Sequence, residues 1–178
     1  EACPMNLAPT SSTTAMLVLG DALAMTLLEA RGFVKEDFAK LHPGGSLGRT
    51  LLTKVSDIMR AGEDFCTVSS GTTLRDALEK MTKYRSGAVV ITEEDYHLRG
   101  ILTQGDFVRS IQKNPNILDN NVSEFMTKDP VTVRDDRLAA EAIKLIGAHR
   151  IDDLVVVNEK GHAIGLVDSQ DLSTMKLI

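Results

Sequence analysis

The octapeptide Gly-Ile-Leu-Thr-Gln-Gly-Asp-Phe at residues 100–107 recurs at residues 165–172 as Gly-Leu-Val-Asp-Ser-Gln-Asp-Leu. The offset between the two is 65 residues (165 − 100 = 65). A shorter pair of segments, Val-Ser-Asp-Ile-Met at 55–59 and Val-Ser-Glu-Phe-Met at 122–126, precedes them at an offset of 67 (122 − 55 = 67). The chain after about residue 55 therefore contains two copies of one repeat. Two such copies that pack about a pseudo-twofold axis form paired clefts able to bind ligands.

Both copies have the same predicted order of elements. In copy one, four apolar residues have the i, i+3, i+4, i+7 spacing of an amphipathic helix over 73–84: Leu74, Ala77, Leu78 and Met81. The β-branched run 87–92 and the segment 98–103 predict two antiparallel strands, and 104–112 predicts a helix. Copy two repeats this order over 137–149, 153–158, 163–167 and 169–176, after a short strand predicted at 131–133. The predicted fold class is α/β (α+β), a tandem pair of β-α-β-β-α repeats.

The first part of the chain predicts one long helix and one short helix. Polar residues 10–14 are suited to begin a helix, which runs to about Arg31 with Gly32 after its end. Apolar residues surround most of this helix, so it is buried against a preceding part of a longer protein, or in an oligomer. The stretch 15–28 is interrupted by Gly20 and Asp21, and we expect no membrane span from it. A short helix over 35–41 ends before Pro43.

Bulk composition excludes several classes of protein. A length of 178 residues with 43% hydrophobic residues suits one or two folded domains. The net charge of −5, without a basic stripe, argues against nucleic-acid binding. Cys3 and Cys66 are far apart and match no metal motif, so we expect two reduced thiols, no metal site and a cytoplasmic location.

The repeated octapeptide carries the candidate ligand-binding residues. Thr103 stands at a helix N-terminus, where free N–H groups and the helix dipole favour an anion such as phosphate. Asp106 lies in the first turn of that helix and can accept hydrogen bonds from two vicinal ribose hydroxyls. The alternative is that Thr103 and Asp106 only cap the helix.

On these motifs, residues 53–178 resemble a tandem pair of CBS domains, in which this Thr and Asp contact a nucleotide's phosphate and ribose. Copy two departs from the pattern because Asp168 stands where copy one has Thr103. A carboxylate repels phosphate, although Asp171 can still hold ribose. We therefore expect one competent nucleotide cleft and one doubtful cleft.

Three segments of the first part carry a second resemblance: Leu-Ala-Pro-Thr-Ser-Ser-Thr at 7–13, Gly-Asp-Ala-Leu-Ala at 20–24 and His-Pro-Gly-Gly-Ser-Leu-Gly-Arg at 42–49. They resemble the C-terminal end of a sugar isomerase (SIS) α/β domain, and with the CBS pair they are similar to the arabinose-5-phosphate isomerase family. The resemblance implies a SIS fragment at 1–52, CBS repeats at 53–112 and 122–178, and a linker at 113–121.

The same resemblance implies an activity. The family interconverts ribulose 5-phosphate and arabinose 5-phosphate for the synthesis of Kdo, a component of lipopolysaccharide, and its members are typically tetramers. It implies a catalytic role for His42, whose imidazole titrates near neutrality and can exchange protons. Four hydroxyl residues could line the sugar-phosphate site or simply cap a helix: Thr10, Ser11, Ser12 and Thr13. His97, His149 and His162 are not expected to be catalytic or to bind metal.

Three functions stay open at this point. The chain is the C-terminal part of an arabinose-5-phosphate isomerase regulated by its CBS pair, or the nucleotide-sensing module of a different phosphosugar isomerase, or a structural pair that only joins subunits. No cofactor is required for the reaction. The regulatory ligand would be an adenosine or cytidine nucleotide, with CMP-activated Kdo as a candidate from pathway logic. Because the other isomerase groups would precede residue 1, we expect no turnover from this chain alone.

Overall fold

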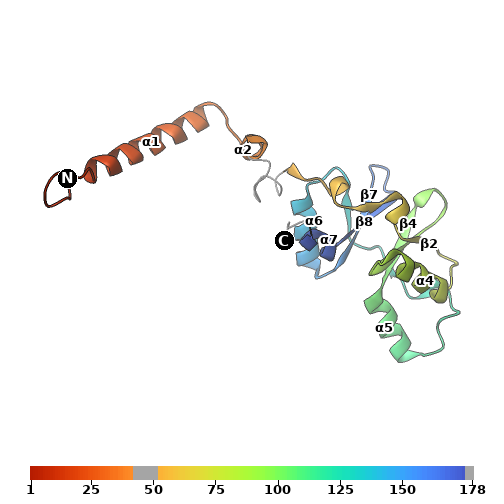
Figure 1. Cartoon of the computed structure of the whole chain (residues 1–178). Coiled ribbons are helices and arrows are strands. Elements are labelled where there is room, and N and C mark those ends of the chain that lie inside the picture. The colour runs from red at the N-terminus through yellow and green to blue at the C-terminus, as the bar shows by residue number, and fades with distance from the viewer. Residues whose placement is uncertain (42–51, 175–178) are drawn as a thin grey trace.

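The computed structural model describes residues 1–41 and 52–174, and within them it contains two four-stranded sheets. One sheet has the order β2 (Thr67–Ser69), β3 (Ala88–Thr92), β4 (Leu98–Thr103), β5 (Thr127–Lys128). The other has the order β1 (Arg60–Ala61), β8 (Ala163–Asp168), β7 (Asp153–Val157), β6 (Thr132–Arg134). Helices α4 (Leu74–Tyr84) and α5 (Gln104–Lys113) belong to copy one, and α6 (Ala139–His149) and α7 (Ser169–Thr174) to copy two (Figure 1).

The sequence-based elements are confirmed where the structure describes them. The predicted central hairpins form, with Ala88 opposite Thr103 and Asp153 opposite Asp168 in antiparallel register. The two helices of the first part are α1 (Ser11–Ala30) and α2 (Lys35–Leu41), and Gly32 follows α1 with a positive φ of 60°. The last residues of the helix predicted over 169–176 lie outside the described residues.

The two copies exchange their leading segments, which the sequence did not reveal. Strand β1 precedes the rest of copy one but pairs antiparallel with β8 of copy two. Strand β5, at the start of copy two, pairs in the same way with β4 of copy one. Hydrogen bonds of the adjoining backbone continue the exchange, from Val55 N to Arg137 O at 2.8 Å and from Val122 N to Thr72 O at 2.8 Å. Each sheet is thus completed by two residues of the other copy.

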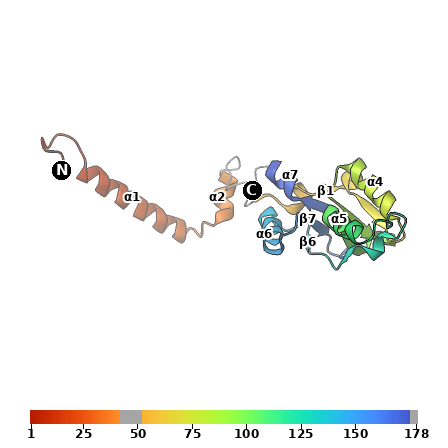
Figure 2. The same cartoon turned by 90° about the horizontal axis from the view of Figure 1, so that it is seen from below.

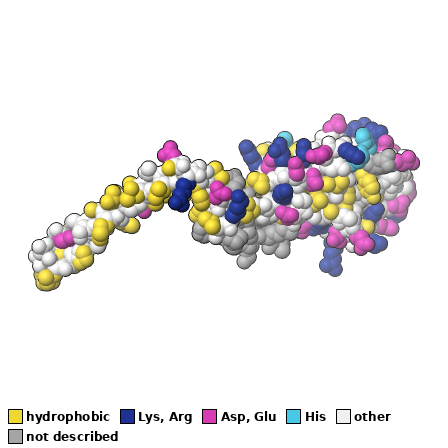
Figure 3. All heavy atoms as spheres, turned by 90° about the horizontal axis from the view of Figure 1, so that it is seen from above, with side chains coloured by type: hydrophobic (Ala, Val, Ile, Leu, Met, Phe, Trp, Pro, Cys, Tyr) yellow, Lys and Arg dark blue, Asp and Glu magenta, His cyan; other side chains and the backbone are white. Residues whose placement is uncertain are grey.

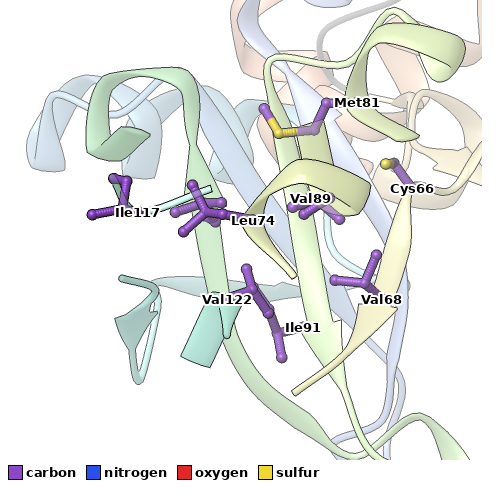
Figure 4. Packing of buried hydrophobic residues seen from close by; sticks show 10 residues of the cluster. Cys66, Val68, Leu74, Met81, Val89, Ile91, Ile117 and Val122 are labelled. Atoms are coloured by element: carbon purple, nitrogen blue, oxygen red, sulfur yellow. The ribbon is translucent and has the colours of Figure 1, made fainter. Parts of the chain in front are cut away.

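Buried residues form three layers around these sheets. In copy one, the helix-facing side of β3 and β4 packs with α4 and with the exchanged segment from copy two (Figure 4). The buried cluster on this side consists of Cys66, Val68, Leu74, Ala77, Met81, Val89, Ile91, Leu102, Ile117 and Val122. A matching cluster serves copy two and includes Val55 and Ile58 from the exchanged segment of copy one.

The third layer lies between the two sheets. It consists of Phe65, Ala88, Val90, Ile101, Val155, Ala163 and Leu166. Every residue of β3 is buried, because one of its faces packs on this layer and the other on the helices. A strand buried on both faces is apolar at successive positions rather than at alternate ones, which explains the β-branched run at 88–92.

The hairpin turns of the two copies meet beside this layer. His97 and His162 form an isolated antiparallel bridge, and their ring centroids lie 5.8 Å apart. The sequence placed these histidines in equivalent turns but did not predict their contact. Within residues 1–41 and 52–174, no group of three or more His, Cys, Asp and Glu side chains is arranged to hold a metal ion.

Helix α1 has no buried residue. It extends away from the strands in both ribbon views (Figures 1 and 2), with hydrophobic side chains along its length (Figure 3). By length and composition alone it is apolar enough to cross a membrane, a test that core helices of soluble proteins also pass. The expectation that this stretch does not span a membrane therefore stays a prediction.

The exchange of leading segments makes a prediction about two glycines. A Cβ on Gly100 would lie 2.7 Å from Thr127 O, and one on Gly165 would lie 2.9 Å from Arg60 O. Because backbone oxygens of the exchanged strands block the space, Gly100→Ala and Gly165→Ala should each lower the free energy of unfolding by about 1–3 kcal/mol. Urea denaturation measures the change.

Gly147 provides the matched control for these substitutions. It lies within α6 with no atom within 4 Å of an added Cβ. Gly147→Ala should raise stability by up to about 1 kcal/mol, because alanine favours helix. Denaturation midpoints that move together for all three variants would contradict the close approach of the exchanged strands.

Candidate functional site

In copy one, Thr103 and Asp106 meet at the start of α5 and form a capping box. The Asp106 Oδ2 atom accepts hydrogen bonds from Thr103 N at 3.0 Å and Thr103 Oγ1 at 2.8 Å. Asp106 N donates in return to Thr103 Oγ1 at 3.2 Å. Thr103 is extended where β4 ends, so helix and strand join without a loop. Both residues therefore cap the helix, and the capping geometry leaves both sequence interpretations open.

The second carboxylate oxygen of Asp106 is paired with a largely exposed arginine. Arg109, one turn along α5, donates to Asp106 Oδ1 at 2.5 Å while its own side chain is 68% exposed. The Asp106 side chain is only 15% exposed. Strand β5 lies alongside, with Thr127 opposite Ile101. The equivalent positions of both copies are thus built from residues of both repeats.

In copy two, Asp168 and Asp171 are joined by an arginine that sequence reasoning missed. Arg60 donates from Nε to Asp171 Oδ2 at 2.6 Å and from Nη2 to Asp171 Oδ1 at 3.0 Å. Its Nη2 lies 3.4 Å from Asp168 Oδ2, and its Nη1 donates to Arg85 O at 3.0 Å. The hydrogen bond to Asp171 and the nearby carboxylates raise the pKa of the guanidinium further above its usual range.

Arg60 comes from the exchanged strand β1, where it occupies the position of Thr127 on β5. Arg60 pairs with Leu166 and Thr127 pairs with Ile101, and these partners are equivalent (166 − 101 = 65). The sequence places Arg60 in copy one, far from Asp171, so only the exchange of strands brings them together. A comparison of the two copies in sequence shows that Arg60 stands where copy two has Thr127. It does not show that Arg60 lies beside Asp171.

Asp153 is a further departure of copy two. It is equivalent to Ala88 (153 − 88 = 65) and lies opposite Asp168 in the β7–β8 ladder. Its Oδ1 atom is buried without a hydrogen-bond partner, and Gly87 leaves room for the carboxyl, since an added Cβ would lie 3.4 Å from Asp153 Oδ2. Burial, helped by the charge of Asp168, raises the pKa of Asp153 from 3.8 to about 7.

A hollow of about 570 Å³ opens beside the Arg60–Asp171 pair. It is lined by Ile58, Met59, Arg60, Ala61, Asp64, Tyr84, Arg85 and Asp171. A second hollow, of about 490 Å³, lies near β4 and β5. Neither hollow is lined by Thr103 or Asp106.

Four of the five candidate isomerase residues, Thr10, Ser11, Ser12 and Thr13, lie at the start of α1. His42 and the loop after it lie outside the described residues. At the start of α1, Glu1 Oε2 accepts hydrogen bonds from Thr10 N at 2.7 Å and Ser12 N at 3.3 Å. Bonds from Ser12 and Thr10 lower the pKa of the exposed Glu1 carboxyl to about 2. Thr13 Oγ1 donates to Thr10 O at 2.8 Å, so it is turned back onto its own helix.

The buried carboxyl of Asp153 makes stability depend on pH. Its pKa is raised from 3.8 to about 7 in the folded chain, so the folded state keeps a proton that the unfolded state releases between these values. The stability that this proton provides is complete below about pH 4 and is lost as the pH rises to about 7. Asp153→Ala should therefore flatten the fall in stability over this range.

At pH 8 the Asp153→Ala variant should also gain about 1–3 kcal/mol over the parent, because it no longer buries a charge. Urea denaturation at several pH values measures both effects. Asp152→Ala, at an exposed neighbouring position, is the control and should keep the slope. An unchanged slope in Asp153→Ala would show that Asp153 is not the titrating group.

Curated relatives match nearly the whole chain. It is 49% identical over 172 residues to the arabinose 5-phosphate isomerase KdsD of Pseudomonas aeruginosa, covering 97% of this chain and 53% of the relative. It is 44% identical to the enzyme of the same name from Escherichia coli K12, covering 97% of this chain and 52% of that relative. The chain thus spans about half the length of the curated relatives that it matches.

Solved structures show the same fold. The CBS domain pair of protein MJ0100, in complex with 5′-methylthioadenosine and S-adenosyl-L-methionine, superposes with a TM-score of 0.62 at 23% identity, covering 70% of this chain and 99% of that one. The CBS domain protein PAE2072 from Pyrobaculum aerophilum, complexed with AMP, has a TM-score of 0.62 at 22% identity and covers 70% and 97%. At these identities the likeness concerns the fold.

The model of the CBS domain matches this sequence at two places, residues 55–113 and residues 122–175. Both contain the repeated octapeptide, and both lie in the part of the chain that folds as the two interlocked sheets. The duplication, the shared fold and the two matches agree, and the chain belongs to the CBS domain family.

Proposed function

We propose that this chain is part of an arabinose 5-phosphate isomerase in which the CBS pair is a nucleotide-binding regulatory module. The observation that carries the proposal is identity of 44–49% to such enzymes over 97% of the chain, including the part that precedes the CBS pair. A CBS module attached to an unrelated catalytic domain would share similarity over the CBS repeats alone.

The proposed reaction interconverts ribulose 5-phosphate and arabinose 5-phosphate through an enediol. It moves a proton between adjacent carbons and requires a group that can both accept and release a proton near neutral pH. His42 is the proposed acid–base group, because an imidazole titrates in that range. Thr10, Ser11, Ser12 and Thr13 are proposed to contact the sugar phosphate. Kdo and lipopolysaccharide synthesis in the cytoplasm is the proposed context.

The proposed nucleotide cleft is that of copy one. Thr103 and the first N–H groups of α5 offer donors to a phosphate. Asp106 offers a carboxylate to vicinal ribose hydroxyls, in exchange for the largely exposed Arg109. Structural relatives in complex with AMP or with an adenosine derivative support this choice of ligand class. An adenosine or cytidine nucleotide is proposed, and CMP-activated Kdo would report the abundance of the pathway's end product.

The exposed apolar surface of helix α1 is a reason to propose a larger assembly. None of its residues is buried within the chain, although apolar side chains surround it. Exposed apolar surface of this extent is covered in a stable protein. We propose that the enzyme domain and its homotetramer, rather than a membrane, cover this helix.

The isomerase proposal is tested in a chimera. Replacing the matching 172 residues of the Pseudomonas aeruginosa relative with this chain should give an active arabinose 5-phosphate isomerase. His42→Asn in that chimera should lower kcat by about a hundredfold or more, because general acid–base catalysis contributes about that factor. A coupled assay of arabinose 5-phosphate turnover measures both.

His149→Asn is the matched control for the chimera, since His149 lies in the last turn of α6 and is exposed. It should retain the rate of the chimera. A chimera that folds but has no activity would contradict the proposed substrate, and full activity in His42→Asn would contradict the proposed role of His42.

The nucleotide proposal is tested by calorimetry with AMP and CMP. Asp106→Ala should weaken binding at least about tenfold, because it removes the ribose acceptor. Asp76→Ala is the matched control: Asp76 also lies in the first turn of a capped helix, and its N–H donates to Thr73 Oγ1 at 3.1 Å. Equal affinity in both variants would favour the capping-only interpretation of Thr103 and Asp106.

A further inference from the structure

We infer that the cleft of copy two is closed by the chain's own Arg60, whose guanidinium occupies Asp171 as a ribose diol would. The chain would then bind one nucleotide, in copy one, and copy two would keep its closed form without any ligand. The inference rests on the proposed nucleotide site of copy one. It goes beyond that proposal by assigning different roles to the two clefts.

Arg60 satisfies the carboxylate of Asp171 at both oxygens. The Nε and Nη2 atoms present two parallel donors, at 2.6 and 3.0 Å from Oδ2 and Oδ1. Two hydroxyls on adjacent ribose carbons would offer the same number of donors to the same two oxygens. The charged pair is the stronger partner, because both groups are ionised and the geometry is bidentate.

Two further contacts hold the guanidinium in place. It approaches Asp168 at 3.4 Å and donates to the backbone oxygen of Arg85 at 3.0 Å. The Arg60 side chain is 22% exposed, and its backbone is fixed in β1 opposite Leu166. A ligand would have to break this whole set of contacts to reach Asp171.

The first cleft differs in this respect. Asp106 is paired with Arg109, which makes one contact to it and is 68% exposed. This arginine can turn into water with little loss, because exposed ion pairs contribute little. Position 127, which corresponds to Arg60, is a threonine, whose side chain carries no charge.

The two copies also differ in the residues at two pairs of equivalent positions. Copy one has the hydroxyl residues Thr103 and Thr127, and copy two has the opposite charges Asp168 and Arg60. Asp168 on its own would repel phosphate, and Arg60 on its own would attract it. Arg60 pairs with both Asp168 and Asp171, and because it is one cation beside two carboxylates, the cluster keeps a net negative charge that disfavours an anionic ligand. Tyr84 and Arg85 line the neighbouring hollow, and so does Asp171. Both carboxylate oxygens of Asp171 already accept hydrogen bonds from Arg60.

The experiment gives copy two the residues of copy one. Calorimetry with AMP and with CMP should give one site per chain for the parent and two for the double variant Arg60→Thr with Asp168→Thr. A parent with two sites, or a variant that remains at one, would overturn the inference and leave the proposed function standing.

A parent without binding would overturn the proposed function instead. In that case a double variant with one site would uphold the closure of copy two, and a double variant without binding would overturn it as well. Circular dichroism and urea denaturation establish that the double variant is folded.

A second variant leaves Arg60 untouched. Thr127→Arg places a guanidinium beside Asp106 at the position that Arg60 has beside Asp171. It should weaken nucleotide binding in copy one by about tenfold or more, through competition for the carboxylate. Unchanged affinity in this variant would overturn the inference even where the double variant does not fold.

Discussion

The exchange of β1 and β5 between the two sheets is the constraint on which the rest of the structure depends. It places Val55 in the core of copy two and Val122 in the core of copy one. It requires glycine at positions 100 and 165, where the exchanged backbone approaches most closely. Because each sheet is completed by the other repeat, neither copy has a full core alone, and the hollow beside Arg60 and Asp171 has walls from both.

The same exchange explains how two copies of one sequence acquire different chemistry. Substitutions on a leading segment change the cleft of the opposite copy, so Arg60 acts on Asp168 and Asp171. Asp153 adds a third carboxyl behind this pair, and its burial keeps a proton on it up to about pH 7. Copy two therefore holds a partly buried charged cluster in which Arg60, from the leading segment of copy one, pairs with Asp168 and Asp171, whereas copy one has a helix cap with an exposed arginine.

Helix α1 stands in contrast to this interlocked core. The CBS part buries its apolar residues within itself, through three connected clusters. Helix α1 leaves Met16, Leu17, Val18 and Leu19 exposed in the chain as described. Burial of such side chains stabilises a fold by about 1.5–3 kcal/mol each, which is the physical reason for proposing that a further surface covers this helix.

Local sequence was sufficient for most of the elements. Apolar spacing located α4, β-branched runs located β3 and β7, and the positions of Thr103 and Asp106 predicted that they meet at one helix start. These signals are local, because a helix period, a strand pattern or a cap involves residues within a few positions of one another. The duplication also predicted paired clefts with unequal chemistry from the single difference between Thr103 and Asp168.

Only the tertiary structure decided which residues share a cleft. Strands β1 and β5 have two residues each, too few to show a period, and their pairing partners lie about a hundred residues away or in the other repeat. The contact of His97 with His162 likewise follows from the packing of two hairpins. The sequence around Asp153 does not indicate that its carboxyl is buried. The burial that raises its pKa comes from the packing of other parts of the chain around it. The sequence by itself determined the repeat and its elements, and packing across the pseudo-twofold axis determined the partners of each charge.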